Sequence, residues 1–269
     1  MENYWIDFIR RCFIHEVETE QADHIELVSV KEGENGNPII RIINRNSNSE
    51  PVQFELDFLA FAGKAGSGKD TAREIYTNLI YGDNGGGFSD SVIVIWSSFA
   101  DKLKEICGLL SNTPLDYFYE ADKKNHYNEV YEMTYRKMAQ LVGTECFREV
   151  FGEDVWVKTV IHHAIREIIF HTDQDLDVDN VSIHVIVADC RFSNEAIAIR
   201  DLGGQVVMID RNHENDEAVS NHASEQLFPI VESLDIILTN QSTLENFEES
   251  IKTLYGVLNS RKLKKNIAA

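Results

Sequence analysis

The sequence of 269 residues has little positive charge: 25 lysines and arginines stand against 45 aspartates and glutamates, a formal net charge of −20. Nucleic acids and anionic membranes are bound through basic surfaces. We therefore expect neither as a partner, although a few local basic groups can still hold a small anionic ligand.

The chain also has few cysteines and no long apolar run. Its four cysteines are widely spaced, form no C-x-x-C pair, and are interpreted as reduced, mostly buried thiols: Cys12, Cys107, Cys146 and Cys190. No run reaches membrane-spanning length, and the start MENYWIDFIRRCF lacks the apolar centre and cleavage site of a signal peptide. We expect a cytoplasmic protein, in the host cytoplasm if the origin is viral.

Short apolar runs alternate with helical patterns through most of the chain. Strands are predicted at 58–63, 91–99, 181–190, 203–210 and 234–240, and helices at 71–81, 101–110, 133–142, 156–170, 194–202 and 244–258. Apolar runs of this kind indicate strands buried on both faces, as in a parallel sheet flanked by helices. The prediction is an α/β fold of the three-layer P-loop NTPase type, with about five mainly parallel strands.

Residues 1–54 read as an extension ahead of a domain at 55–269. Apolar residues at helical spacing near the start predict a short amphipathic helix, and HIELVSV and NPIIRIINR flank KEGENG as a predicted hairpin. We find no chemistry in the extension, and expect extra packing or an oligomer contact.

A glycine-rich loop follows the first predicted strand, in FLAFAGKAGSGKDTAREI. Its glycines let the backbone turn tightly against phosphate oxygens, and the loop opens a helix, whose N-terminus favours anions. The lysine reaches the β- and γ-phosphates. The predicted phosphate-binding residues are Gly63, Lys64, Ala65, Gly66, Ser67, Gly68 and Lys69.

The usual hydroxyl residue after the lysine is displaced by one position. Asp70 stands there, and Thr71 follows. Either side chain can hold magnesium, directly or through water, and Thr71 can also cap the helix. GK-x-T spacing occurs in several nucleotide kinases, so the shift favours a small-molecule kinase.

Three further segments supply candidates for the acceptor. Asp189 and Arg191 follow the strand 181–190, where Asp189 can orient magnesium waters or an acceptor, or merely cap a helix, and Arg191 can clamp phosphate or form a surface ion pair. Arg136 and Gln140 share a helix face before Gly143, Thr144 and Arg148; an ordinary amphipathic helix has the same pattern. The polar segment near 211–226 is either a lid or a plain surface loop.

Five ordered segments between about residues 58 and 255 resemble the deoxynucleoside monophosphate kinases of tailed bacteriophages. They are GKAGSGKDTA, SFADKLKEICGLL, YRKMAQLVGTECFR with DVWV, VADCRFSNEAIAIRDLGGQVVMIDR, and NHASE. An acidic residue after the lysine is usual in this family. Lys102 stands where a proline is common, and the extension has no counterpart.

The resemblance implies transfer of the γ-phosphate of ATP to a deoxynucleoside monophosphate, with magnesium. It assigns residues 63–71 to ATP, with Thr71 and Asp70 toward the metal, and Lys69, Arg191 and Asp189 to catalysis. The acceptor set it implies is Phe99, Ala100, Lys104, Arg136, Gln140, Gly143, Thr144, Arg148, Trp156 and Glu195, and the lid set is Arg211, His222 and Glu225.

Two alternatives stay open from the sequence. One is a P-loop kinase for another small acceptor, such as a phosphorylated metabolite or dephospho-coenzyme A; the other is an ATP-binding or ATPase module without an acceptor. A homodimer is a further expectation, from the family and from spare apolar surface on the first helix.

Overall fold

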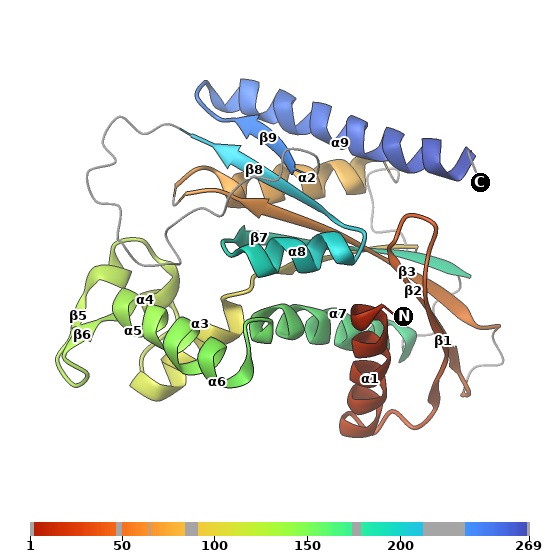
Figure 1. Ribbon diagram of the computed structural model, residues 1–269, viewed down its shortest axis with the longest axis horizontal. Helices are drawn as coiled ribbons and strands as arrows, with labels where there is room; N and C mark the ends of the chain where they lie inside the picture. The colour runs from red at the N-terminus through yellow and green to blue at the C-terminus, as the bar shows by residue number, and fades with distance from the viewer. Residues whose placement is uncertain are drawn as a thin grey trace.

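The computed structural model describes residues 3–46, 50–64, 66–83, 91–173, 179–211 and 235–267 (Figure 1). Its centre is a parallel sheet of five strands in the order β4-β7-β3-β8-β9. These strands are β3 (Val52–Ala62), β4 (Val92–Ser97), β7 (Asn180–Cys190), β8 (Gln205–Asp210) and β9 (Asp235–Thr239). The predicted α/β class and the five mainly parallel strands are confirmed.

An antiparallel hairpin widens this sheet to seven strands. Its strands are β1 (Ile25–Glu32) and β2 (Pro38–Asn44), and β2 pairs with the first half of β3. The second half of β3 pairs with β8 on that same edge. The turn of the hairpin packs closely against the residues just before β8. A Cβ on Gly203 would lie only 2.5 Å from the carbonyl carbon of Gly36. The glycine permits this approach.

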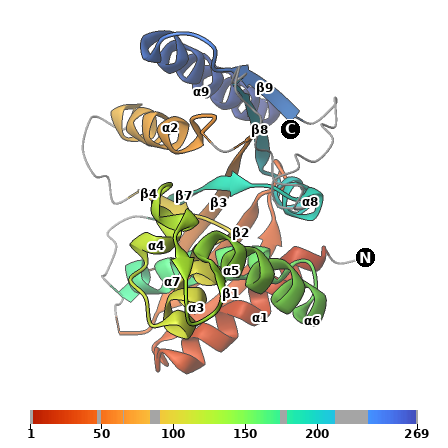
Figure 2. The same cartoon turned by 90° about the vertical axis from the view of Figure 1, so that its left-hand side faces the viewer.

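Two layers of helices cover the sheet (Figure 2). On one face lie α1 (Tyr4–Thr19), α7 (Val155–Asp173) and α8 (Ser193–Asp201), whose buried side chains form one large core with the sheet. On the other face lie α2 (Lys69–Asp83) and α9 (Leu244–Ile267). The first 54 residues therefore share a sheet and a core with the rest of the chain; the division at residue 54 itself stays a prediction.

A helical lobe lies at the carboxyl ends of the strands, at the lower left of Figure 1. It has its own small core and consists of α3 (Asp101–Ser111), α4 (Asp116–Tyr119), η1 (Lys123–Asn125), β5 (Tyr127–Asn128), β6 (Met133–Thr134), α5 (Tyr135–Leu141), η2 (Val142–Arg148) and α6 (Glu149–Phe151). In this lobe the structure corrects one sequence prediction: the single helix at 133–142 begins only at Tyr135 and continues past residue 142 as a π-helix.

The connections of the sheet locate the binding edge. The chain leaves β3 toward β4 on one side and leaves β7 toward β8 on the other, so the strand order reverses between the neighbours β3 and β7. Ligands of open α/β sheets bind outside the carboxyl ends of the strands at such a point.

The structure also describes the environment of the four cysteines and the hydropathy of the helices. Three cysteines are buried and Cys146 is exposed. In the described part of the chain, no helix combines the length and the hydropathy that crossing a membrane requires.

Candidate active site

The glycine-rich loop lies between β3 and α2, at the reversal point. Gly63, Gly66 and Gly68 have φ values of 145°, 74° and 102°, which other residues rarely adopt. A Cβ on Gly63 would lie 2.5 Å from the carbonyl oxygen of Ile209, and one on Gly68 would lie 2.6 Å from the side-chain nitrogen of Asn240. The loop is therefore tightly packed between β8 and the end of β9, and only glycine fits at these two positions.

The lysine of the loop folds back over it. Lys69 Nζ donates to the carbonyl oxygens of Gly63 and Lys64, at 2.9 and 2.6 Å. Asn240, at the end of β9, donates to the carbonyl oxygen of Ser67 at 2.8 Å and is buried. The ammonium group thus stands inside the loop, and Asn240 ties the loop to the far side of the sheet.

The two residues after Lys69 carry side-chain oxygen atoms, which are the type of ligand that magnesium binds. Asp70 is an exposed carboxylate on the first turn of α2, 3.4 Å from the guanidinium of Arg73, and Thr71 is partly buried beside it. Magnesium takes oxygen ligands, commonly one or two protein side chains together with phosphate oxygens and water. No group of three or more potential metal-binding His, Cys, Asp or Glu side chains occurs among the described residues. Thr71 and Asp70 would supply one or two oxygen ligands to a metal that arrives with a nucleotide.

Across the reversal point, a pocket opens between the sheet and the helical lobe. All ten residues assigned to the acceptor, together with Asp189 and Arg191, line it. Its wall includes the apolar side chains of Phe99, Leu103, Phe118, Ala139 and Trp156. It also includes five basic groups and two carboxylates: Lys104, Lys124, Arg136, Arg148, Arg191, Asp189 and Glu195. A ligand with an apolar ring system and an anionic group matches such a wall.

A π-helix shapes the long wall of the pocket. Residues 136, 140, 144 and 148 are four apart, and all four line the pocket. An α-helix has about 3.6 residues per turn, so a step of four residues rotates slightly more than one full turn about the axis. In the wider π-turns of η2 the same step rotates slightly less than one full turn. The two deviations have opposite signs, which keeps the four positions on one face. Trp156 donates from its indole N–H to the carbonyl oxygen of Gly143 at 3.0 Å, inside this widened turn.

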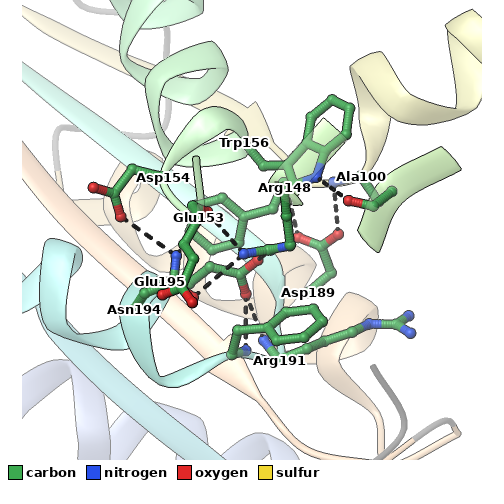
Figure 3. Close-up of polar contacts among 12 residues, drawn as sticks. Ala100, Arg148, Glu153, Asp154, Trp156, Asp189, Arg191, Asn194 and Glu195 are labelled. Carbon is green, nitrogen blue, oxygen red and sulfur yellow. Dashed lines mark hydrogen bonds and ion pairs between the residues drawn. The ribbon is translucent and has the colours of Figure 1, made fainter. Parts of the chain in front are cut away.

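Asp189 lies near the end of β7, next to the glycine-rich loop, as the sequence predicted. Ala62, which precedes the loop, is the register partner of Cys190, which follows Asp189. Its carboxylate accepts the backbone N–H groups of Phe99 and Ala100, at 2.8 and 3.0 Å, and the hydroxyl of Ser98 (Figure 3). These contacts hold the turn at residues 98–100, which precedes α3. A role toward magnesium or the acceptor stays a prediction.

Arg148 and Glu195 form a buried ion pair in the wall of the pocket (Figure 3). Arg148 Nη1 also donates to the carbonyl oxygen of Glu153 at 2.8 Å, and the guanidinium lies over the ring of Phe192 at 3.9 Å. Glu195 Oε2 accepts the N–H groups of Arg191 and Phe192, at 2.8 and 3.0 Å. Burial raises the pKa of Glu195 to about 7, against the lowering effect of Arg148. The charge of Arg148 is thus opposed by Glu195, and its predicted contact with the acceptor stays a prediction.

From the Arg148–Glu195 ion pair we predict that loss of Arg148 lowers the stability of the fold by an amount that depends on pH. Replacing Arg148 with methionine leaves a buried carboxylate without its cation, which costs about 3–5 kcal/mol of unfolding free energy. Glu195 already has a raised pKa in the folded chain, and it takes up a proton as the pH falls below that value. Once neutral, it needs no cation, so the loss should be smaller at pH 5.5 than at pH 8.

Urea unfolding of Arg148→Met at the two pH values measures this. The matched control is Arg45→Met, whose partner Glu26 lies on the exposed hairpin, with an expected cost below about 1 kcal/mol. Equal losses at both pH values would contradict the account of the pair.

The remaining basic groups of the pocket lie beside aromatic and polar side chains. In Figure 3 the Arg191 side chain extends away from the Arg148–Glu195 pair. Lys104 Nζ lies 3.9 Å from the ring centre of Tyr119 and 3.8 Å from Asp101. Burial lowers the pKa of Lys104, and Asp189 and Asp101 oppose that effect. Arg136 donates from Nε to the side chain of Asn125 at 3.1 Å.

Some residues of the site were not predicted from the sequence. They are Leu103, Phe118, Lys124, Tyr135, Ala139 and Phe192 in the pocket wall, and Asn240 at the loop. Of the predicted lid, Arg211 directly follows β8 and donates to the carbonyl oxygen of Gly66 at 3.4 Å. His222 and Glu225, like Ala65 of the loop, lie outside the described residues.

Comparisons with known proteins identify related sequences. A protein-family model described as deoxynucleotide monophosphate kinase matches residues 67–251. A curated protein of Acanthamoeba polyphaga mimivirus, named "Putative deoxynucleotide monophosphate kinase", is 32% identical over 198 residues, which are 72% of this chain and 93% of that protein.

Two solved structures are more remote. A dephospho-CoA kinase from Campylobacter jejuni is 18% identical, with 77% of this chain and 99% of that chain covered and a TM-score of 0.33. A protein from Thermus thermophilus is 15% identical, with 75% and 97% covered and a TM-score of 0.32. TM-scores this low carry no argument about fold or function.

Proposed function

Because the chain belongs to the deoxynucleotide monophosphate kinase family, we propose that it transfers the γ-phosphoryl group of ATP to a deoxynucleoside 5′-monophosphate. The products are the deoxynucleoside diphosphate and ADP. The preference for the deoxy sugar rests on the family, and the accepted bases are left to experiment.

One observation carries the proposal: the glycine-rich loop and the mixed apolar and cationic pocket face each other across the neighbouring strands β3 and β7. A phosphate donor on the loop and an acceptor in the pocket would meet at the ends of these strands. Holding two reactants in this way replaces an encounter in solution with a reaction inside one complex.

The transfer needs no covalent intermediate and no general base. An oxygen of the acceptor phosphate attacks the γ-phosphorus, the bond from that phosphorus to the β–γ bridging oxygen breaks, and ADP leaves with the electron pair. Around neutral pH the acceptor phosphate is largely deprotonated already, because its second pKa is about 6. The demand on the protein is to position two polyanions and to offset their charge.

The residues divide this task by position. Lys69 and the loop amides would hold the donor phosphates, while Arg191 and Arg136 would offset charge on the acceptor and the moving phosphoryl group. Asp189 would act by holding the turn at residues 98–100 against the pocket. Magnesium, when bound with ATP by Thr71 and Asp70, would supply charge neutralisation on the phosphates.

A panel of acceptors tests the proposal. ADP formation is measured with ATP and each of the four deoxynucleoside monophosphates, with the matching ribonucleotides, and with no acceptor. We expect ADP only when a deoxynucleoside monophosphate is present. ADP release without an acceptor would instead identify an ATPase, and a response to dephospho-coenzyme A alone would identify a kinase for another acceptor.

The partners follow from this chemistry. Small nucleotides are the proposed ligands, whereas nucleic acids and membranes are not proposed as partners of so acidic a chain. A cytoplasmic location and a homodimer are proposed as well. The dimer now rests on the family, because Trp5, Ile9 and Phe13 of the first helix are buried in the core of the chain itself. Light scattering after size-exclusion chromatography measures the oligomeric state.

A further inference from the structure

Lys124 is a basic residue of the pocket that neither the sequence motifs nor the family resemblance singled out. It lies in the middle of η1, a single 3₁₀ turn between α4 and the small hairpin of the helical lobe. Its side chain lines the pocket together with Lys104, Arg136 and Arg191. Lys124 is therefore one of the basic residues of the pocket wall.

The turn that carries Lys124 is held from both sides. Its neighbour Lys123 pairs with Asp116 and with Glu120, the latter at 3.0 Å. On the other side, the side chain of Asn125 accepts the hydrogen bond from Arg136 Nε. The N–H of Lys124 itself donates to the carbonyl oxygen of Glu120 at 3.1 Å. Adjacent contacts thus anchor η1 and leave the Lys124 side chain at the pocket wall.

The charges around Lys124 are mostly of its own sign. Lys123 has two carboxylate partners, but for Lys124 no ion pair occurs among the residues that the structure describes. Burial lowers the pKa of Lys124, and Lys104, Arg136 and Arg191 lower it further, while Asp70 opposes them. Lys104, Lys124, Arg136 and Arg191 thus line one pocket, where the carboxylate of Asp189 offsets part of their charge and an anionic ligand would offset more.

We propose that Lys124 is a substrate-binding residue, whose ammonium group contacts the phosphate of the acceptor together with Arg136 and Arg191. This inference rests on the proposed function, since it takes a nucleoside monophosphate as the ligand of the pocket. The acceptor phosphate is favoured over the phosphates of ATP because Lys124 lines the pocket beside Tyr135 and Phe118, whereas none of the described residues of the glycine-rich loop lines it.

Equilibrium binding separates this contact from a structural role. Dissociation constants are measured by calorimetry for the deoxynucleoside monophosphate that the wild type binds tightest, for the same deoxynucleoside without phosphate, and for ATP. The variants are Lys124→Gln, Lys124→Arg and the control Lys102→Gln. Lys102 is an exposed lysine of α3 that pairs with Glu105 at 2.7 Å and does not line the pocket.

Lys124→Gln removes a hydrogen bond between charged groups. We therefore expect this variant to bind the monophosphate roughly tenfold to a hundredfold more weakly than the wild type. Binding of the nucleoside and of ATP should change less than about twofold, Lys124→Arg should recover part of the loss, and Lys102→Gln should match the wild type. If Lys124→Gln does not fold, as judged by circular dichroism, Lys124→Arg and Lys124→Met carry the same comparison.

Three results would overturn the proposal: Lys124→Gln equal to Lys102→Gln, equal losses for nucleotide and nucleoside, or a loss confined to ATP. The proposed function fails differently. A wild type that binds the monophosphate but forms no diphosphate refutes the reaction and leaves the Lys124 contact standing, whereas a wild type that binds no deoxynucleoside monophosphate refutes both.

Discussion

Lys69→Ala should lower kcat by roughly 10³-fold or more, because the ammonium group stabilises charge that develops on the transferring phosphate. The side chain already stands inside the glycine-rich loop, where it donates to the carbonyl oxygens of Gly63 and Lys64. A donor phosphate seated on the loop amides would lie within its reach. The substitution removes the charge and leaves the glycines, β3 and α2 in place.

Steady-state ADP formation at saturating ATP and acceptor measures this effect, with circular dichroism as the check of folding. Lys69→Met preserves the length of the side chain without its charge and should be equally impaired. The matched control is Lys252→Ala, an exposed lysine of α9 that pairs with Glu248 at 3.2 Å and should keep wild-type activity. A kcat within tenfold of the wild type for Lys69→Ala would contradict the assignment.

Arg191→Ala should have an effect of similar size, a loss of roughly 10³-fold in kcat/KM. Arg191 follows β7, lines the pocket, and extends away from the buried Arg148–Glu195 pair (Figure 3). Its backbone N–H donates to Glu195, and alanine keeps that N–H group. The substitution therefore removes a cation at the meeting point of donor and acceptor without breaking the contact that starts α8.

Arg191→Lys tests what the guanidinium contributes beyond its charge. Lysine keeps the charge but lacks the planar pair of donors, so we expect only a partial recovery of kcat/KM. The matched control is Arg45→Ala on the exposed hairpin, which pairs with Glu26 and should leave kcat/KM unchanged. An Arg191→Ala variant as active as Arg45→Ala would refute the role.

The parallel core was predictable from the sequence because its strands are near-continuous apolar runs. The exception is the start of β3. The sequence VQFELD at 52–57 alternates, and its partner is β2 of the hairpin, so only the tertiary pairing shows that the strand begins at Val52 rather than Phe58. For the same reason, the sequence could not show that the hairpin joins the central sheet.

The candidate site was predictable where motifs carry it and hidden where distant contacts form it. The residues at 136, 140, 144 and 148, which the family resemblance assigns to the acceptor, line one pocket, but the π-helix that aligns them leaves no local periodic signal. The pairing of Arg148 with Glu195 joins residues 47 positions apart. Lys124 depends on the fold of a short turn, and Asn240 on a strand end packed against the loop. None of these contacts follows from local sequence.

Transfer of label from γ-labelled ATP tests the central claim most directly. The purified protein is incubated with magnesium, labelled ATP and each deoxynucleoside monophosphate in turn, and the nucleotides are separated by chromatography. The account predicts label in the β-position of a deoxynucleoside diphosphate, with none released as free phosphate. Label found only in inorganic phosphate, whichever acceptor is present, would contradict it.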